Sequence, residues 1–463
     1  MRLLDQSLRS LAAGLRARKF SALDLWQEAR GAMDAHESRL KAYKLRMDDS
    51  AGSEARAADA AFAAGKDLGV FQGIPVSVKD LYGIPGWPTF AGSARELPAR
   101  FRAAGPIVQC LLDECAVIPG KTHTAEFAFG GVGVNNHWGT PRNPWDTQHH
   151  RVPGGSSSGA GVSLREGSAI VALGSDTAGS VRVPASLTGN AGYKPTIGRW
   201  STEGISPLSR IFDTPGVLAR SVDDAFLAAA ELDRRMFGDR PGAIGTSSAP
   251  ERLRIGVPEE HFWDDCDPGI AESVRAALAH LERAGHRLVP MKFPEAVEAF
   301  ELWMAGGTVG AELHAFLVRE LPEWMPLLDP IVGKRMQAVA GTSAEEILRR
   351  KSAFEQLAAR VPARFEGVDV IATPTVAFTP PRLDEVSDYE AYRAANLRML
   401  RNTPAANLLR LCAITMPVGL DAQGMPVGLQ VMGAHMQDDR LFAAALAMER
   451  ELPGFGAMLD RKS

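Results

Sequence analysis

Strand-like and helix-like segments alternate along residues 66–230, and this alternation constrains the fold of the chain more than any other feature. "GIPVSVKD" at 73–80 has the β-branched composition of a short strand, and the turn-forming "YGIPGWP" closes it. "AVIPGKTHTAEFAF" at 116–129 repeats the pattern of a strand followed by a loop. Such alternation favours an α/β fold over separate all-α and all-β halves. Apolar strand-like segments return at 368–376 and 413–420, which predicts one sheet that is completed late in the chain.

The segments that flank this region read mainly as helices. In residues 1–65, Ser21 and Asp24 form a capping-box pattern at the start of one helix, and a second, alanine-rich helix ends at Gly65. Residues 268–365 are mainly helical, with two clearly amphipathic stretches. The linker-like composition of 238–252 predicts a surface loop, because a strand follows it immediately.

Composition limits the location and the partners of the protein. The chain has 463 residues, of which 45% are hydrophobic, so one large core or two to three smaller ones can form. A net charge of −4 argues against nucleic acid or an anionic membrane as the main partner. Residues 1–10 lack the pattern of a signal peptide, and no apolar run is long enough to span a bilayer. The four cysteines show no metal-binding spacing. We therefore expect a cytoplasmic protein.

The Gly/Ser-rich stretch "VPGGSSSGAG" at 152–161 has the composition of a flexible tether. Its "GSSSG" also matches the GxSxG elbow, in which Ser157 would be a nucleophile. That elbow requires a strand directly before it, and a polar, proline-bearing loop stands there instead. The match to the elbow is therefore weak.

Residues 116–126 contain two further motif-like stretches that carry little weight. "GKT" at 120–122 ends like a phosphate-binding loop, but Cys115 occupies the position at which that loop needs glycine. His123 and Glu126 lie one helical turn apart without a third metal ligand, so Glu126 is expected to be structural. We predict neither a nucleotide site nor a metal site here.

Lys79 is a candidate general base. A serine nucleophile needs a base to take its proton, and a lysine serves when burial disfavours its charged form. Lys79 lies inside an apolar strand, where an unpaired ammonium would be costly. The alternative is a structural lysine that reaches solvent or pairs with a carboxylate such as the adjacent Asp80.

"GSDTAGS" at 174–180 is a second candidate element of an active site. Glycine and alanine allow a close approach of the backbone to a substrate, and successive N–H groups can converge on one oxygen. An oxyanion hole for acyl transfer is built in this way. The alternative is a tight turn after the strand "AIVALG".

Taken together, these segments resemble the amidase signature family. "GIPVSVKD", "PGGSSSGAG", "ALGSDTAGSVRVPASLTGNAGYKPTIGRWSTEGISPLS" and "DTPGVLARSVDD" follow the motifs of that family in order, over about residues 69–225. The resemblance resumes at "VDVIATPT" and "AITMPVGLDAQGMPVGLQVMG". It implies the amidase signature fold, an α/β fold with a large twisted mixed β-sheet covered by helices on both faces. It also implies one domain over 1–463, with N-terminal helices (1–65), a catalytic signature core (66–230), a variable, mainly helical substrate-specificity region (258–365) and a C-terminal completion of the core (366–463).

The resemblance also implies the catalytic residues. The family uses a Ser–cis-Ser–Lys triad whose two serines lie 24 positions apart, as Ser156 and Ser180 do. Ser180 is then the nucleophile, Ser156 the bridging serine after a cis peptide bond, and Lys79 the base. The backbone N–H groups of the oxyanion hole come from Thr177, Ala178, Gly179 and Ser180. Ser157 and Asp176 match positions that orient the triad, and Arg182 matches a nearby position that also faces substrate.

The implied activity is hydrolysis of a small-molecule amide through an acyl-enzyme, with release of ammonia or an amine and with no metal or organic cofactor. Val183 stands where the glutamine-using catalytic chains of tRNA amidotransferases have a polar residue. The chain therefore looks more like stand-alone amidases and the allophanate-hydrolase branch. The alternatives are a glutamine-hydrolysing chain of an amidotransferase complex, an esterase and a non-catalytic member. A homodimer is the family-level expectation.

The sequence does not identify the substrate. The pocket is expected to include parts of 301–316 and of the 122–138 loop. Trp303, Met304 and Phe316 either contact the substrate there or belong to the core.

Overall fold

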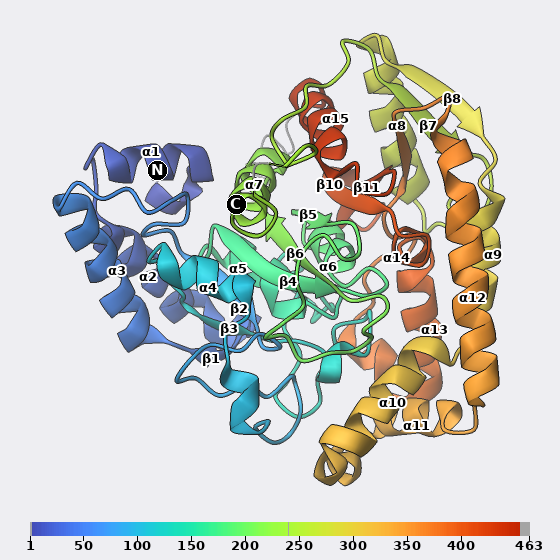
Figure 1. The fold of residues 1–463 in the computed structure, drawn as a ribbon, viewed down its shortest axis with the longest axis horizontal. Coiled ribbons are helices and arrows are strands. Elements are labelled where there is room, and N and C mark those ends of the chain that lie inside the picture. The colour runs from blue at the N-terminus through green and yellow to red at the C-terminus, as the bar shows by residue number, and fades with distance from the viewer. Residues whose placement is uncertain (1, 239, 454–463) are drawn as a thin grey trace.

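The computed structural model describes residues 2–238 and 240–453, and its centre is one mixed sheet of eleven strands (Figure 1). β2 pairs in parallel with β3 and β4, and β7 pairs in parallel with β8 and β9, while the other pairs are antiparallel. This mixed sheet confirms the predicted fold class. From edge to edge the strands are β1 (Tyr43–Arg46), β3 (Gly120–Thr122), β2 (Val76–Lys79), β4 (Val171–Asp176), β6 (Thr214–Ala219), β5 (Ala191–Lys194), β10 (Cys412–Leu420), β11 (Pro426–Gly433), β9 (Val370–Pro374), β7 (Arg254–Pro258) and β8 (Arg287–Met291).

The N-terminal helices lie beside the β1 edge of the sheet (Figure 1). They are α1 (Leu8–Arg16), α2 (Ala22–Leu40) and α3 (Asp48–Ala63). The capping box predicted for α2 is present: the Ser21 side chain accepts from the Asp24 N–H, and the Asp24 carboxylate accepts from the Ser21 N–H. The expectation of helices alone for 1–65 was incomplete, because β1 lies between α2 and α3. With only four residues, this edge strand is too short to show a clear period-2 pattern.

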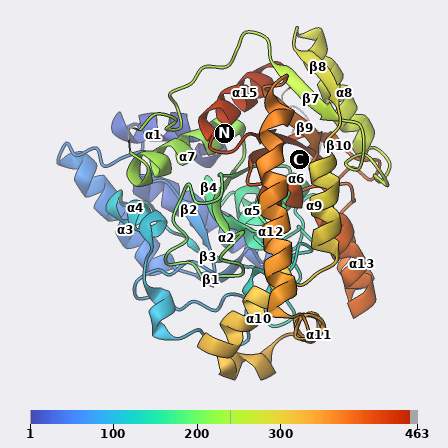
Figure 2. The same cartoon turned by 45° about the vertical axis from the view of Figure 1, so that its right-hand side comes forward.

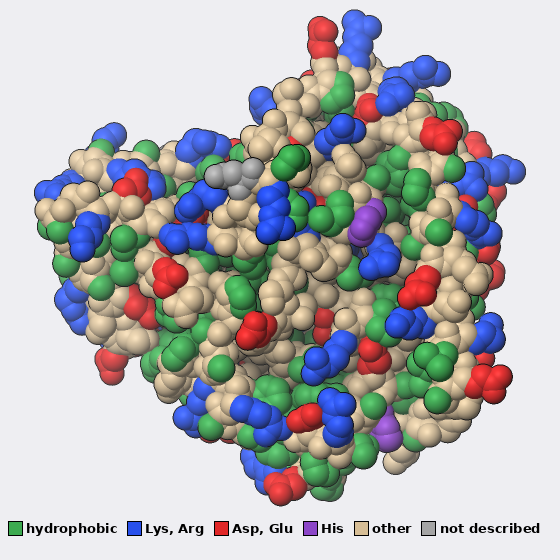
Figure 3. Space-filling view, viewed as in Figure 1, with side chains coloured by type: hydrophobic (Ala, Val, Ile, Leu, Met, Phe, Trp, Pro, Cys, Tyr) green, Lys and Arg blue, Asp and Glu red, His purple; other side chains and the backbone are tan. Residues whose placement is uncertain are grey.

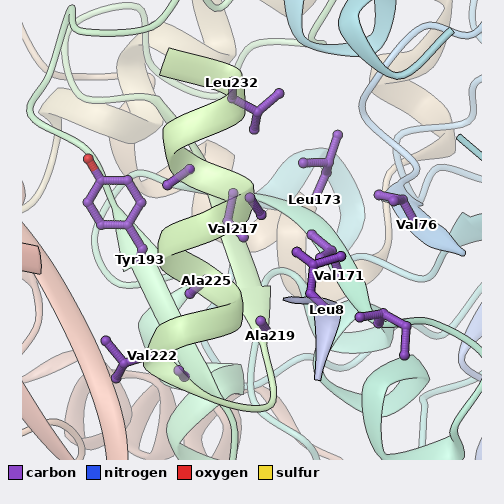
Figure 4. Close-up of a cluster of buried hydrophobic side chains, with 14 of the residues drawn as sticks. Leu8, Val76, Val171, Leu173, Tyr193, Val217, Ala219, Val222, Ala225 and Leu232 are labelled. Carbon is purple, nitrogen blue, oxygen red and sulfur yellow. The ribbon is translucent and has the colours of Figure 1, made fainter. Parts of the chain in front are cut away.

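The central strands are buried on both faces of the sheet. Their successive apolar side chains point to opposite faces. Val171 and Leu173 of β4 point toward α7 (Val222–Met236), as Figure 4 shows, and belong to the largest hydrophobic cluster. Ala172, between them, packs on the other face, where α5 (Ser158–Glu166) and α6 (Arg182–Leu187) lie. A strand of this kind reads as a continuous apolar run in the sequence.

The region predicted to be mainly helical contains α8 (Ile270–Arg283), α9 (Pro294–Met304), α10 (Thr308–Glu320), α11 (Pro330–Val339) and α12 (Ala344–Arg360). Of these, α9 and α12 lie side by side in both views (Figures 1 and 2). The region also contains β8, which the sequence analysis missed. β8 is at the sheet edge and has exposed and half-buried residues, so it lacks the apolar run of the central strands.

The remaining helices are α4 (Pro106–Asp113), α13 (Tyr389–Leu400), α14 (Pro404–Leu408) and α15 (Asp438–Glu451). Short 3-10 helices occur at Leu3–Asp5, Ala99–Arg102, Glu126–Ala128, Pro322–Leu327, Val361–Phe365 and Leu383–Val386.

The C-terminal strands complete the central sheet. β10 pairs with β5 of the signature region on one side and with β11 on the other. Residues 454–463 of the predicted C-terminal part lie outside the described residues. The division of the chain into one domain of four parts stays a prediction.

The surface combines charges of both signs, which are interspersed over the face shown in Figure 3. The described residues between α7 and β7 form a loop, as the composition of 238–252 predicts. Among the helices that the structure describes, none has the length and apolar character needed to cross a membrane.

Candidate active site

The register of β2 against β4 positions the candidate base. The two strands are parallel, with Val76 opposite Val171 and Val78 opposite Leu173, so both strands end at the same edge of the sheet. Ser77, two residues before Lys79, hydrogen bonds with Ser163 of α5. Because strand side chains alternate, Lys79 points to this same face, where α5 begins.

Lys79 is surrounded by serine hydroxyls. Its Nζ atom lies 2.7 Å from the Ser156 Oγ atom and 2.9 Å from each of the Ser157 and Ser175 Oγ atoms. The side chain is fully buried, so it does not reach solvent. Asp80 does not pair with it, because the Asp80 carboxylate is 2.9 Å from the Nζ atom of Lys121. Among the described residues, Lys79 has no ion pair.

Burial changes the charge state of Lys79. Removal of the ammonium from water lowers the pKa of Lys79 to about 7, although the negative charges of Asp213 and Asp176 oppose the shift. The uncharged amine is therefore accessible near neutral pH. An amine in this state has a free electron pair and can accept a proton.

The Gly/Ser-rich stretch is not a tether, because every residue from 152 to 161 is buried. The Gly155–Ser156 peptide bond is cis, as the family resemblance predicts. A Cβ atom on Gly155 would lie 2.7 Å from the backbone of Gly133, so only glycine allows this approach. The Ser157 N–H donates to the Ser180 carbonyl at 3.2 Å, which joins the stretch to the second loop.

Asp176 organises the loop that carries Ser180. Its carboxylate accepts from the Gly179 N–H at 2.8 Å, from the Val181 N–H at 3.1 Å and from the Arg182 guanidinium at 2.9 Å. Burial alone would raise the pKa of Asp176, but the charge and hydrogen bonds of Arg182, the charge of Lys194 and a hydrogen bond from Asn407 together hold this pKa well below its usual range. The loop is therefore fixed around a permanent carboxylate.

Arg182 does not face a substrate, so this part of the prediction was wrong. The side chain is fully buried, and its remaining donors contact the Thr403 carbonyl at 2.8 Å, the Asn407 side chain at 2.6 Å and the Gln430 side chain at 2.5 Å. The sequence analysis missed these three partners, which are more than 200 positions away. The one signal in the sequence is Gln430 itself, a polar residue in an apolar strand.

Ser175 is a further residue that the sequence analysis missed. Its hydroxyl contacts Lys79, and its N–H donates to the Ser157 Oγ atom at 3.3 Å. The signal that could have identified it is its position, because it lies at the end of a strand parallel to the strand of Lys79.

Three of the four N–H groups predicted for the oxyanion hole have no acceptor. In the described part of the chain, the N–H groups of Thr177, Ala178 and Ser180 form no hydrogen bond with the protein. The Gly179 N–H is engaged by Asp176, so the candidate hole contains three donors rather than four. Ala178 has no positive φ, and its carbonyl accepts from the Thr403 hydroxyl at 2.6 Å.

A pocket of about 640 Å³ reaches this site at Ser175. Phe316 of α10 and Ala128 of the 122–138 loop line it, as predicted, whereas Trp303 and Met304 do not. Trp303 packs against hydrophobic clusters, and Met304 is 41% exposed. The pocket is lined by Leu81, Arg100, Phe101, Ala103, Ala128, Ser175, Ser201, Thr202, Glu203, Gly204, Ile205, Ser206, Pro207, Leu208, Arg210, Asp213, Thr214, Pro215, Phe316 and Glu320.

Glu126 has a structural role, as expected. Its carboxylate contacts the His137 ring at 3.0 Å and accepts from the Asp329 N–H at 2.8 Å. These contacts attach the 122–138 loop to the segment before α11.

Loss of the buried Asp176–Arg182 ion pair is expected to destabilise the protein. Replacing Arg182 with methionine leaves Asp176 as an uncompensated buried charge, and we expect the free energy of unfolding to fall by about 3–5 kcal/mol. The matched control is Arg254→Met, which breaks an exposed pair with Asp369 and should lower the free energy of unfolding much less. Urea denaturation of both variants measures the difference. Equal losses would contradict a special role of the buried pair.

Comparison with known proteins identifies the class to which this fold and site belong. Residues 25–442 match the family model described as "Amidase". The chain is 49% identical to a 2-amino-5-chloromuconic acid deaminase from Comamonas testosteroni, over 96% of this chain and 95% of that protein. It is 33% identical to the A-type chain of a glutamyl-tRNA(Gln) amidotransferase from Anaeromyxobacter sp. (strain K), over 96% of both chains. A solved structure described as "Crystal structure of amidase" superposes with a TM-score of 0.85 at 28% identity, over 97% of this chain and 100% of the other.

The chain therefore belongs to the amidase family. It is a hydrolase of carbon–nitrogen bonds other than peptide bonds.

Proposed function

We propose that this protein hydrolyses the C–N bond of a small-molecule amide with Lys79, Ser156 and Ser180. The observation that carries the proposal is the contact of a fully buried lysine amine with serine hydroxyls and, among the described residues, with no carboxylate. Nothing in the packing of an apolar core requires this arrangement, and burial of an unpaired amine is costly. An uncharged amine among hydroxyls is suited to proton transfer.

In the first step, the uncharged Lys79 amine takes the proton of Ser156 while Ser156 takes the proton of Ser180. The Ser180 oxygen then forms a bond to the amide carbonyl carbon, and the carbonyl electron pair moves onto the oxygen. The shortest contact of Lys79 is the one to Ser156, which supports this direction of the relay. The proton returns through Ser156 to the leaving nitrogen, the C–N bond breaks, and an acyl-enzyme remains.

In the second step, water attacks the ester carbon of the acyl-enzyme. Its proton passes through Ser156 to Lys79, and the bond to Ser180 breaks as Ser180 regains a proton. The net reaction adds one water across the C–N bond and leaves the enzyme unchanged. This sequence needs no metal or organic cofactor, in line with the expectation from the family resemblance.

The oxyanion is held by the free N–H groups of Thr177, Ala178 and Ser180. Such donors act when they are fixed before the charge develops, and loss of one typically costs about 3–4 kcal/mol. Asp176 and Arg182 fix the backbone of this loop from behind. Ser157 and Ser175 orient the Lys79 amine.

A second candidate activity is the removal of ammonia from an amino-substituted unsaturated diacid. The name of the 49% identical relative supports it. So does Arg210 on the pocket wall, which forms no hydrogen bond or ion pair among the described residues and can bind a carboxylate. The atoms of this reaction balance with water alone. The C–N bond breaks, ammonia leaves, and water supplies the oxygen that replaces the nitrogen.

The substrate test measures ammonia release by the purified chain alone. The panel contains aliphatic amides, aryl amides, ureido acids, 2-aminomuconic acids and glutamine, with Ser180→Ala as the control enzyme. We expect release from at least one small amide or amino diacid, and none from the control. Release from glutamine only would instead indicate a component of an amidotransferase complex.

The cytoplasmic location and the homodimer stay predictions of the sequence analysis.

A further inference from the structure

Asp213 lies between the loop of Ser180 and the wall of the pocket. Its Oδ1 atom accepts from the Thr177 hydroxyl at 2.6 Å. Its Oδ2 atom accepts from the N–H groups of Leu208 and Ser209, each at 2.9 Å. Asp213 and Leu208 also line the pocket. One carboxylate thus joins a residue of the candidate oxyanion hole to the surface that a substrate would contact.

The register of two strands fixes this position. Asp176 of β4 is opposite Thr214 of β6, and the Thr214 hydroxyl donates to the Asp176 carbonyl at 2.8 Å. The residues next to this pair, Thr177 and Asp213, are therefore held together just beyond the sheet edge.

The hydrogen bonds continue from this carboxylate to α10. The Ser209 hydroxyl donates to the Glu312 side chain, and Ser209 also accepts at its carbonyl from the Asp213 N–H at 2.9 Å. Phe316, one turn after Glu312 on the same helix, lines the pocket. A polar connection therefore runs from Thr177 through Asp213 and Ser209 to α10.

We propose that Asp213 is a positioning residue that orients Thr177 in the oxyanion hole. This inference rests on the proposed function. Asp213 does not touch the reacting atoms, so its effect passes through Thr177. Its hydrogen bond to the Thr177 hydroxyl adds a side-chain restraint to the backbone contacts that Asp176 makes in this loop.

The charge states at the site agree with this role. Burial raises the pKa of Asp213 to about 6, so the carboxylate is ionised at neutral pH. Its charge opposes the effect of burial on Lys79 and raises the pKa of that amine. The other charged groups around these two are Asp176 with Arg182, Glu312, whose pKa burial raises, and the exposed Arg210.

The test compares Asp213→Asn with Thr177→Val. Both variants lose the hydrogen bond to the Thr177 hydroxyl or weaken it, and we expect kcat to fall on the order of 10-fold to 100-fold, with little change in KM. Only Asp213→Asn removes a charge. It should therefore also lower the pKa of Lys79 and shift the acid limb of the pH profile of kcat/KM to lower pH, whereas Thr177→Val should leave the limb in place.

Asp421→Asn is the matched control. Asp421 also accepts from a threonine hydroxyl, Thr379 at 2.7 Å, and from two backbone N–H groups, but it lies in the turn between β10 and β11. Its replacement should leave kcat and the acid limb unchanged.

An unchanged kcat in Thr177→Val, or an unchanged kcat in a folded Asp213→Asn, would overturn the inference. If Asp213→Asn does not fold, the kcat of Thr177→Val alone tests the inference. Failure of the proposed function is distinguishable, because it would appear as retained activity in Ser180→Ala.

Discussion

Replacing Ser180 with alanine is expected to lower kcat by a factor on the order of 10⁴–10⁶, because no covalent intermediate can form. The variant should fold, since the change removes one hydroxyl from a loop whose backbone is fixed by Asp176. Substrate affinity should change little, because the pocket and the candidate oxyanion donors remain. Steady-state ammonia release, with thermal unfolding as a check of folding, measures the effect.

Ser186→Ala is the matched control for that variant. Ser186 is also buried, and it lies six positions further along the chain in α6. Its replacement should leave kcat within a factor of a few. Equal activity of the two alanine variants would show that Ser180 is not the nucleophile.

Replacing Lys79 with methionine is expected to lower kcat/KM by a factor on the order of 10²–10⁴, the usual contribution of a general base. Methionine has a similar length and fits a buried apolar strand, so the fold should persist. In the wild-type enzyme, kcat/KM should rise through about pH 7, because the reactive form of Lys79 is the uncharged one. Below that pH the rate should fall about tenfold per pH unit as the amine gains its proton.

Lys194→Met is the control for the lysine. Lys194 is likewise fully buried, and burial lowers its pKa to about 8, but its amine contacts the Pro195 carbonyl rather than serines. This variant should keep the activity and the acid limb near pH 7. A Lys79→Met variant with wild-type activity, or one that keeps the same acid limb, would exclude Lys79 as the base.

Local patterns predicted the elements of this protein that local interactions determine. The capping box at Ser21 and the apolar runs of β4 and β9 depend on neighbouring residues and on burial, so they are visible in the sequence. The edge strands β1 and β8 were missed because they are short and partly exposed, and their pairing depends on partners distant in the chain.

The residues of the candidate site likewise divide into those that could be predicted from the sequence and those that could not. The family resemblance placed Lys79, Ser156 and Ser180, and the structure shows the contact of Lys79 with Ser156 directly. The resemblance could not show that Gly179 donates to Asp176, or that Arg182 is enclosed by residues from α14 and β11. The enclosure of Arg182 depends on how segments more than 200 positions apart pack, which no local motif encodes.

The most direct test of the account is to find which atom a fluorophosphonate probe modifies. The intact protein is labelled at pH 8, digested, and its peptides are analysed by mass spectrometry. The account predicts one adduct, on Ser180, which is absent from Ser180→Ala and forms far more slowly in Lys79→Met. An adduct on Ser156 or Ser157 instead, or no adduct on an enzyme that still releases ammonia, would contradict the assignment of Ser180 as the nucleophile.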